Sequence, residues 1–507
     1  MNSQAKPTRL PFLEKFGYGL GDTASNFVWA LMMNFIMFYY TDIFGITAAA
    51  AGTMLLFARS TDGVVDFFIG AVADRTKSKW GRFRPYLVWL CVPLAVVFVL
   101  AFTTPNISPA GKLVWAWVTY NLLMLLYSAI NIPYGALSGV MTDDPLERTS
   151  LNSYRMSLAQ IGGIIANSSF LVLIVKFAGG AQGQKLDSLS LAAKQTGAQH
   201  TVMLFAAIGI ALFLLSFLTT KERIHPPVDQ KTNLLQDLKT LFKNPHWIMM
   251  FAVGIINITF AVVRGTAGMY YLNSFLKWNG EKIGLYFLIS GLSMIFGAMM
   301  TRFAVKAIGK KWAFITSLAL VGITAIPYFF IKGDLTNLLI NTSILGHLVQ
   351  IDQTTALVMT FQIIGMFVAG INATLFWAMV ADTADFQEWK FKTRTTGVAF
   401  SATTCAQKAG MGIGAAVAGF LISSFGYVPN AAQQTPEAIR GILLLVSLIP
   451  AVGLLLLSGL FTIYGLNEDI CKTMRDDLAQ RRAQVVSPVA PTAPRPKVPD
   501  TGSLVNA

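Results

Sequence analysis

The chain has 507 residues and a formal net charge of +14, and 54% of its residues are hydrophobic whereas only 13% are charged. A soluble globular domain carries about a quarter charged residues, so this composition excludes an ordinary soluble domain. Apolar runs of about 18 residues or more recur along the chain, and a transmembrane barrel would alternate in shorter segments instead. The sequence therefore predicts an all-α polytopic membrane protein.

Twelve membrane spans are predicted, six on each side of a long basic loop. Their ranges are 17–40, 49–73, 86–104, 113–141, 153–178, 201–220, 246–276, 283–305, 313–331, 356–381, 397–424 and 441–465. The predicted organisation is an N-terminal segment 1–16, a six-helix bundle 17–220, a central loop 221–245, a second bundle 246–465 and a tail 466–507. The polar start "MNSQAKPTRLPFLEK" precedes an apolar run too long for a signal core, so the first span is expected to be retained.

Lysine and arginine are concentrated in alternate loops. "DRTKSKWGRFRP", the central loop, "GKKW" and "KFKTR" are basic, whereas "TDIFGIT", "TPNISPAGK" and "SSFGYVPNAAQQTPEA" are not. The positive-inside rule then predicts that both termini are cytoplasmic, and it explains the net charge without nucleic acid. Basic loops after spans 2 and 8 indicate two parallel repeats, which bind substrate between them near the midplane. The Pro-rich stretch "VVSPVAPTAPRPKVPD" is expected to be disordered.

Motifs of enzymes and metal sites are missing from the sequence. Cys91, Cys405 and Cys471 lack metal or disulfide spacing, and the four histidines do not cluster. There is no P-loop, Ser–His–Asp set or zinc pattern. We therefore expect a protein that is not an enzyme, holds no cofactor and draws its energy from an ion gradient.

Span 2 carries three ionisable residues in "ARSTDGVVDFFIGAVADR". Arg59, Asp62 and Asp66 follow one another at three and four residues, so they share one helix face. An acidic group at the bilayer centre costs roughly 2.5–3.5 kcal/mol, so this face is expected to meet a cavity or a partner. The alternative is a buried Arg–Asp pair that fixes helix packing, but such a pair needs only one carboxylate. The second carboxylate leaves a negative charge that could bind a cation or a proton. Val65 beside Asp62 offers no oxygen, which favours H⁺ over Na⁺.

Span 4 contains "YSAINIPYGALSG". Tyr127, Asn131 and Tyr134 fall on one face with Ser128 adjacent, and Pro133 is expected to kink the helix. Aromatic rings and amides on one face suit a sugar, whose apolar side stacks on the rings. Interhelical hydrogen bonding is the alternative.

Other spans carry candidate substrate ligands. Asp22 and Asn26 lie one turn apart in span 1, although Asp22 could cap or sit near the interface. Arg155 begins span 5, where it either enters the cavity or snorkels. Arg264 lies deep in span 7 and is expected to bind a sugar hydroxyl, an acidic residue or an anionic group on the substrate. Lys408 in span 11 can pair with the span 2 carboxylates across the two halves.

Charged residues close spans 2 and 10 at the cytoplasmic edge. Asp74 and Arg75 end "GAVADR", and Asp382 and Asp385 lie in "ADTADFQEWKFKTR". We expect these residues to form a gate of ion pairs, and the alternative is an ordinary charged loop at the membrane surface.

Several motifs, taken in order, resemble one transporter family. "YGLGD", "FYYTDIFGI", "ARSTDGVVD", "ADRTKSKWGRFRPY", "NIPYGALSGVMTDDPLERTSL" and "ADTADFQEWK" resemble the glycoside–pentoside–hexuronide:cation symporters of the major facilitator superfamily. The resemblance covers residues 14–465 and implies twelve transmembrane helices in two six-helix bundles. "VRGTAGMYYL" and "TTKER" look most like the xyloside-type permeases, a branch that also carries the arginine at position 264.

The resemblance also implies roles for individual residues. Asp62 and Asp66 match the family's cation-site carboxylates, and Ser128 matches a hydroxyl that helps to coordinate the cation. Asn26 and Asn131 stand where melibiose permease has sugar-binding aspartates, and Gly135 replaces an aromatic residue there. A melibiose-like sugar is therefore not expected. The other matches to cavity positions are Tyr127, Arg155, Trp377 and Lys408.

The resulting expectation is a secondary active symporter of the cell inner membrane. It imports a glycoside, pentoside or related sugar derivative with H⁺ or Na⁺, with H⁺ favoured, by alternating access, and works as a monomer. The alternative is an exporter or lipid transporter on the same scaffold. A membrane enzyme would need a catalytic constellation, and a sensor would carry a further soluble domain.

Overall fold

The structure is almost entirely helical. The computed structural model describes residues 9–486 apart from 143, 224–238, 332, 334, 336, 345–346, 393–395 and 432. Twelve segments correspond to the twelve predicted spans: α1 (Phe12–Asn34) continued by α2 (Ile36–Phe38) and η1 (Tyr39–Phe44), α3 (Ala48–Arg75), α4 (Pro85–Ala101), α5 (Pro109–Met141), α6 (Pro145–Phe177), α7 (Leu191–Thr219), α9 (Pro245–Tyr270) with η3 (Tyr271–Phe275), α10 (Gly280–Ile308), α11 (Lys310–Ala325) with η4 (Ile326–Phe329), α12 (Gln353–Phe391), α13 (Thr396–Ser424), and α14 (Pro436–Val446) with α15 (Leu448–Leu460) and η5 (Phe461–Ile463).

Most of these segments can cross a bilayer by length and composition. In the part of the chain that the structure describes, nine helices meet both requirements, and the pair that bends by 58° after Asn34 makes a tenth. The other two segments are α4, with 17 residues, and α3, which carries the ionisable stripe. The predicted helical membrane architecture is thus confirmed.

Caps and prolines explain where several spans begin and break. The side chains of Thr47 and Ser108 accept hydrogen bonds from backbone N–H groups at the starts of α3 and α5. The last span is broken at Ser447 between α14 and α15, because Pro450 has no N–H to donate to the carbonyl four residues earlier.

A β-hairpin and a helix that follows the last span were not predicted from the sequence. Strands β1 (Leu338–Ile344) and β2 (His347–Asp352) form an antiparallel hairpin before α12. Helix α16 (Glu468–Val486) occupies the first part of the predicted tail, and the Pro-rich stretch from residue 487 onward lies outside the described residues. The tail prediction therefore missed a helix of 19 residues.

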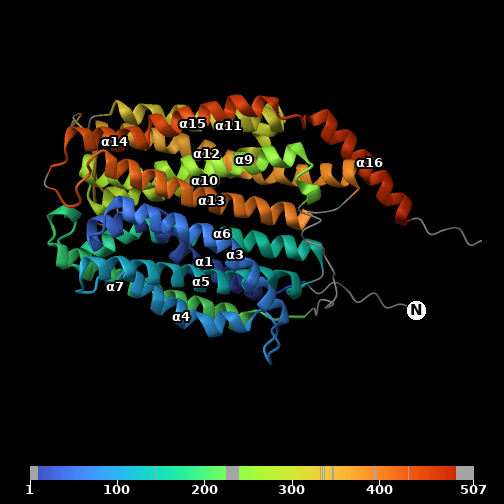
Figure 1. Ribbon diagram of the computed structural model, residues 1–507, viewed down its shortest axis with the longest axis horizontal. Helices are drawn as coiled ribbons and strands as arrows, with labels where there is room; N and C mark the ends of the chain where they lie inside the picture. The colour runs from blue at the N-terminus through green and yellow to red at the C-terminus, as the bar shows by residue number, and fades with distance from the viewer. Residues whose placement is uncertain are drawn as a thin grey trace, which may run out of the picture.

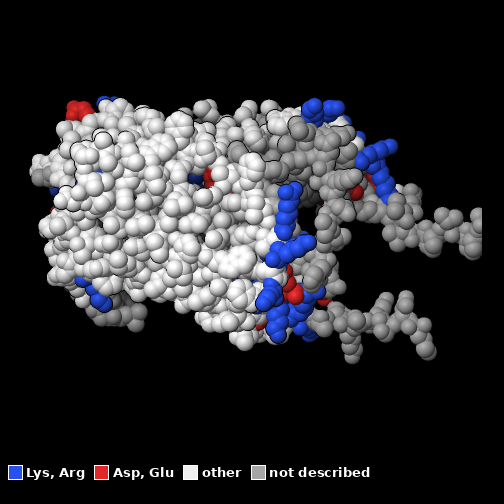
Figure 2. All heavy atoms as spheres, turned by 60° about the horizontal axis from the view of Figure 1, so that its bottom comes forward, with Lys and Arg blue, Asp and Glu red and all other residues white. Residues whose placement is uncertain are grey.

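The spans form two halves that lie one above the other in Figure 1. The N half comprises α1–α7 and the C half comprises α9–α15. The start of α1 and helix α16 lie at the same end of the molecule, which we call the terminal end, and the opposite end is the far end. Figure 2 shows a wide belt with almost no charge and a gathering of lysine and arginine at the terminal end. This distribution fits a bilayer around the belt.

Glycines let the halves meet backbone to backbone at the far end. A Cβ added to Gly284 in α10 would lie 2.2 Å from the carbonyl oxygen of Ser168 in α6, and one added to Gly419 in α13 would lie 2.4 Å from that of Ala48 in α3. Helices α6 with α10 and α3 with α13 thus carry the contact between the halves. Both contacts lie near the far end, which is closed in this structure.

A methyl group at Gly284 is expected to disfavour this closed state. Gly284→Ala places Cβ against a backbone carbonyl that cannot rotate away, and such overpacking costs about 1–3 kcal/mol. In a background without native cysteines, Ile43→Cys, buried at the far end, should react faster with a membrane-impermeant maleimide when Gly284→Ala is present. Gly459→Ala is the matched control because a Cβ there meets nothing within 4 Å. Unchanged labelling in Gly284→Ala would contradict the assignment of this contact.

Candidate functional site

A cluster of three charged side chains joins the two halves at mid-depth. Lys408 of α13 forms ion pairs with both carboxylates of α3: its Nζ lies 2.9 Å from Asp62 Oδ2 and also contacts Asp66 Oδ2. The Ser128 hydroxyl of α5 donates a hydrogen bond of 3.0 Å to Asp62 Oδ1. The structure therefore brings together Asp62, Asp66, Ser128 and Lys408, from three helices and both halves.

Arg59 lies on the same face of α3 but does not pair with Asp62. Its guanidinium stacks over the Trp29 ring of α1 at 4.9 Å, and Nη2 lies 3.4 Å from Met33 Sδ. The Arg–Asp pair considered from the sequence is replaced by the Lys408 pair, because the C half supplies a cation that reaches both carboxylates.

The two carboxylates of the cluster differ in their exposure. The Asp62 side chain is 2% exposed, whereas that of Asp66, one turn nearer the terminal end, is 25% exposed. Among the described residues, Asp66 Oδ1 has no hydrogen-bond partner although it is buried. A buried acceptor costs free energy unless it is paired, and a proton or a small cation would pair it. The cluster can thus take up one positive charge.

A second ion pair lies within the N half. Arg155 of α6 donates from Nε to Asp22 Oδ2 of α1 at 2.7 Å, and its guanidinium lies 5.2 Å from the Tyr134 ring centroid. Asn26, one turn from Asp22, donates its side-chain N–H to the Asp22 carbonyl at 2.9 Å. Arg155 therefore reaches inward from α6 and does not extend to the membrane surface.

Two stacked aromatic pairs flank the charged residues. Tyr127 of α5 stacks on Trp29 at 5.5 Å between centroids, and Trp377 of α12 stacks on Phe400 of α13 at 5.8 Å. Asn131 donates its side-chain N–H to the Tyr127 carbonyl at 2.9 Å, which leaves its amide oxygen free of that bond. Such rings can stack on the apolar face of a sugar. Trp29 was not predicted, since a tryptophan in an apolar run carries no distinctive signal.

Arg264 of α9 lies apart from the carboxylate cluster. Its Nη2 lies 3.5 Å from Gln362 Oε1 of α12, and its guanidinium stacks over Tyr328 at 5.2 Å. Gln362 is buried and donates to the Ser290 hydroxyl at 2.8 Å. This polar network around Arg264 was not predicted, because its neutral members resemble ordinary interhelical contacts.

Of the residues predicted to form a gate, Asp382 has an ion pair that the structure defines. Lys310 Nζ of α11 lies 2.5 Å from Asp382 Oδ2 of α12, so that pair stays within the C half. Arg75 is exposed, Asp385 is partly buried, and the Asp74 side chain lies outside what the structure describes. The gate across the halves stays a prediction.

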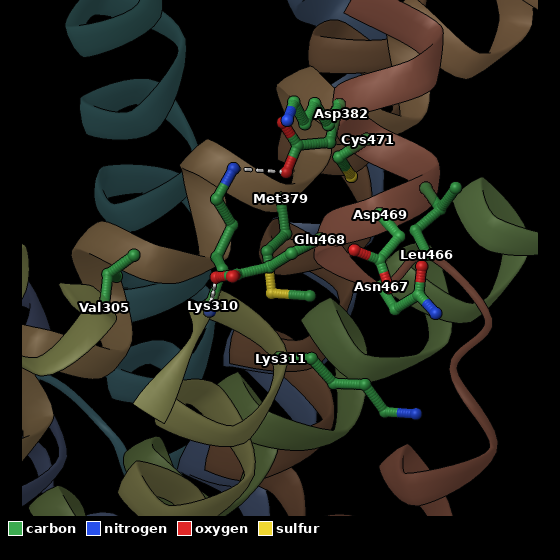
Figure 3. A pocket seen from close by; sticks show the side chains of 11 residues that line it. Val305, Lys310, Lys311, Met379, Asp382, Leu466, Asn467, Glu468, Asp469 and Cys471 are labelled. Atoms are coloured by element: carbon green, nitrogen blue, oxygen red, sulfur yellow. Dashed lines mark hydrogen bonds and ion pairs between the residues drawn. The ribbon is translucent and has the colours of Figure 1, made fainter. Parts of the chain in front are cut away.

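A pocket of about 370 Å³ surrounds the Lys310–Asp382 pair at the terminal end. Figure 3 shows the Lys310 and Asp382 side chains directed toward each other, and the α16 residues Glu468, Asp469 and Cys471 also line the pocket. Glu468 accepts a hydrogen bond of 3.1 Å from the backbone N–H of Lys310. Helix α16 therefore meets α11 and α12 at this pocket. Asp62, Asp66 and Lys408 do not line it.

The far end is closed by hydrogen bonds that sequence reasoning missed. Asp42 of η1 accepts from the Tyr427 hydroxyl at 2.7 Å, and the Thr41 and Tyr270 hydroxyls lie 2.7 Å apart. Asn430 donates to the Asp42 carbonyl at 2.7 Å. Burial, and then the Asp42 charge, raise the pKa of Tyr427 well above its ordinary value, so its hydroxyl stays protonated and donates. We call these five residues the far-end latch.

Comparison with known proteins identifies the class of this architecture. The family model described as MFS/sugar transport protein matches residues 17–468. The chain is 34% identical to the inner membrane symporter YicJ of Escherichia coli K12, over 93% of this chain and 96% of that protein. It is 32% identical to the isoprimeverose transporter of Lactiplantibacillus pentosus, over 94% and 93% of the two chains.

A solved structure supports the same fold. The crystal structure of a D-xylose–proton symporter superposes with a TM-score of 0.62 at 11% identity, covering 90% of this chain and 98% of that one. Fold, charged cluster and relatives agree that the chain is a multi-pass membrane transporter and not an enzyme. It belongs to the glycoside–pentoside–hexuronide:cation symporter family of the major facilitator superfamily.

Proposed function

We propose that this protein imports a glycoside, pentoside or related sugar derivative together with H⁺ or Na⁺, with H⁺ favoured. The observation that carries the proposal is the pairing of Asp62 and Asp66 with Lys408 across the two halves. Two carboxylates with one ammonium leave one negative charge for a coupling ion. The names of the relatives, a symporter and an isoprimeverose transporter, support a sugar as the second substrate.

The coupling ion acts on the contact between the halves. A proton on Asp66 removes its attraction for Lys408, which is one of the links between α3 and α13. The sugar binds with the stacked rings of Tyr127 and Trp29 in the N half on one side and Trp377 of the C half on the other. The polar side chains near its hydroxyls are those of Asp22, Asn26, Asn131 and Arg155. Ion and sugar then stabilise each other's binding, and that coupling is reciprocal.

The orientation follows from the basic terminal end. Lysine and arginine gather there, so we place this end in the cytoplasm and the far end outside. The structure then corresponds to an inward-facing state, closed outside by the far-end latch. Val65 next to Asp62 provides no oxygen ligand, whereas a proton needs only one carboxylate, so H⁺ is the favoured ion.

Uptake into proteoliposomes tests this function. We expect isoprimeverose, or another member of a panel of labelled glycosides, to accumulate when an inward H⁺ gradient is imposed, and an Na⁺ gradient alone to have less effect. A protonophore should abolish the H⁺-driven uptake. An exporter or lipid transporter on the same scaffold would give no inward accumulation with either gradient, and that result would overturn the proposal.

A further inference from the structure

Helix α10 presents to the outside an apolar stripe that ends in two cations. Its apolar members are spaced by three or four residues and are 44–65% exposed: Leu292, Phe296, Met299 and Phe303. Residues at this spacing share one helix face. Lys306 continues the stripe three residues after Phe303, Arg302 lies one turn before Lys306, and both are exposed. The face of α10 that meets the acyl chains of a bilayer therefore carries two positive charges near the terminal end.

No carboxylate of the described chain forms an ion pair with Arg302 or Lys306. Several other cations at the terminal end do have acidic partners: Lys15 with Glu147, Arg223 with Glu14 and Lys310 with Asp382. Charged residues on membrane helices rarely face lipid, because the hydrocarbon does not solvate them. The counter-charge of Arg302 and Lys306 is therefore expected from outside the described chain.

The depth of Arg302 suits a lipid headgroup. Arg302 precedes Ile308, the last residue of α10, by six residues, which is about 9 Å along the helix axis. Just beyond the end of α10, Trp312 of α11 is exposed, and tryptophan is enriched at the level of the headgroups. The Arg302 side chain can therefore extend along α10 toward that level, where its planar guanidinium can donate two hydrogen bonds to one phosphate. The Lys306 ammonium, one turn closer to the surface, can reach the same phosphate.

A third cation lies across the turn from α10 to α11. Gly309 is the single residue between the two helices, and its φ of 77° is a backbone conformation that glycine adopts without strain. The turn is therefore tight and keeps Lys311 near Lys306. Figure 3 shows the Lys311 side chain extending away from the Lys310–Asp382 pair. Three cations close to one headgroup favour a lipid with a net negative charge over a zwitterionic lipid, which brings an ammonium group of its own.

We propose that the terminal end of α10 binds an anionic phospholipid, with the phosphate between Arg302 and Lys306 and the acyl chains along Phe303 and Met299. The site goes beyond the proposed transport function and does not depend on which sugar or ion is carried. Helix α10 packs on α12 of its own half and on α6 of the N half, so the bound lipid anchors the C half in the leaflet at the terminal end.

Fluorescence quenching by brominated lipids tests this site. Ala307→Cys, at an exposed position in the full-length protein without its three native cysteines, carries a bimane fluorophore. Vesicles of phosphatidylcholine contain either brominated phosphatidylglycerol or brominated phosphatidylcholine with the same chains. Each cation near a membrane surface strengthens binding of an anionic lipid roughly 5-fold, so phosphatidylglycerol should bind here at least ~10-fold more strongly than phosphatidylcholine. Replacing both cations, by Arg302→Gln with Lys306→Gln, should lower this ratio at least ~5-fold.

Matched controls show whether the preference belongs to this site. Arg440→Gln removes an exposed arginine from the start of α14 at the far end and should leave the ratio unchanged. A fluorophore at Leu456→Cys, on the exposed face of α15, should be quenched equally by the two lipids. Because Arg302 and Lys306 are exposed, the double variant should keep the unfolding temperature of the unmodified protein in detergent.

The lipid is also distinguished from a free anion. Inorganic phosphate should not release phosphatidylglycerol, because it lacks the chains that contact Phe303, whereas high salt should weaken the preference by screening the cations. Equal quenching by the two lipids at Ala307→Cys, an unchanged ratio in the double variant, the same preference at Leu456→Cys, or release of the lipid by inorganic phosphate would overturn the inference.

Discussion

Asp66→Asn is expected to abolish uphill accumulation of substrate while leaving exchange down a gradient intact. One elementary charge moving through 100 mV is worth about 2.3 kcal/mol, which supports roughly 50-fold accumulation. An amide at position 66 cannot be protonated or carry the negative charge that a cation needs. The ratio of internal to external substrate should therefore fall to about 1 under a gradient that gives strong accumulation in the unmodified protein.

Asp66 is a better choice for this experiment than Asp62. Its side chain is 25% exposed and its Oδ1 lacks a hydrogen-bond partner among the described residues, whereas Asp62 accepts from Ser128 and is nearly inaccessible. The amide therefore disturbs packing less at position 66. Asp476→Asn, on the exposed surface of α16, is the matched control and should accumulate substrate normally. Accumulation by Asp66→Asn against a gradient would remove Asp66 from the coupling site.

Lys408→Met is expected to slow transport by on the order of 100-fold or more and to change its dependence on the coupling ion. Removing one partner of a buried ion pair costs about 3–5 kcal/mol, because the remaining charges are left uncompensated. Here two carboxylates remain, one turn apart on α3. They can lower their mutual repulsion only by holding a cation, so the ion should bind more tightly and leave more slowly.

Initial uptake rates over a range of pH and Na⁺ concentrations measure this effect. Lys408→Arg keeps the charge and should restore a large part of the rate and the original ion dependence. The unfolding temperature in detergent reports separately on the stability lost with the ion pair. A Lys408→Met protein with normal rates and normal ion dependence would show that Lys408 is a packing contact and not a competitor of the coupling ion.

Charged residues inside apolar runs were the most informative part of the sequence. The bilayer penalises such groups strongly, so their presence predicts a partner or a cavity, and the stripe of Asp62 and Asp66 led directly to the helix face where Lys408 lies. The twelve spans follow for the same reason, since a hydrocarbon interior tolerates few alternatives to an apolar helix.

Pairing between distant loops could not be predicted in the same way. Asp42 and Tyr427 are 385 residues apart, and both lie in short polar stretches where a charge or hydroxyl costs little. Asp382 was expected to take part in a gate of ion pairs at the cytoplasmic edge, and in this structure its partner is Lys310 of the neighbouring helix α11. Charged groups near water have several partners of similar energy, so sequence position alone does not select one.

The first helix of each half ends in the same unusual way. Tyr39–Phe44 and Tyr271–Phe275 are both π-helical turns, and they stand at equivalent places in the two repeats. A π turn holds one residue more per hydrogen-bonded ring than an α turn, so relaxing it to α geometry would rotate the residues beyond it by about 100°. Thr41 lies in one of these turns and Tyr270 directly precedes the other. A register shift of a single residue would thus part the two hydroxyls without any bending of the long helices.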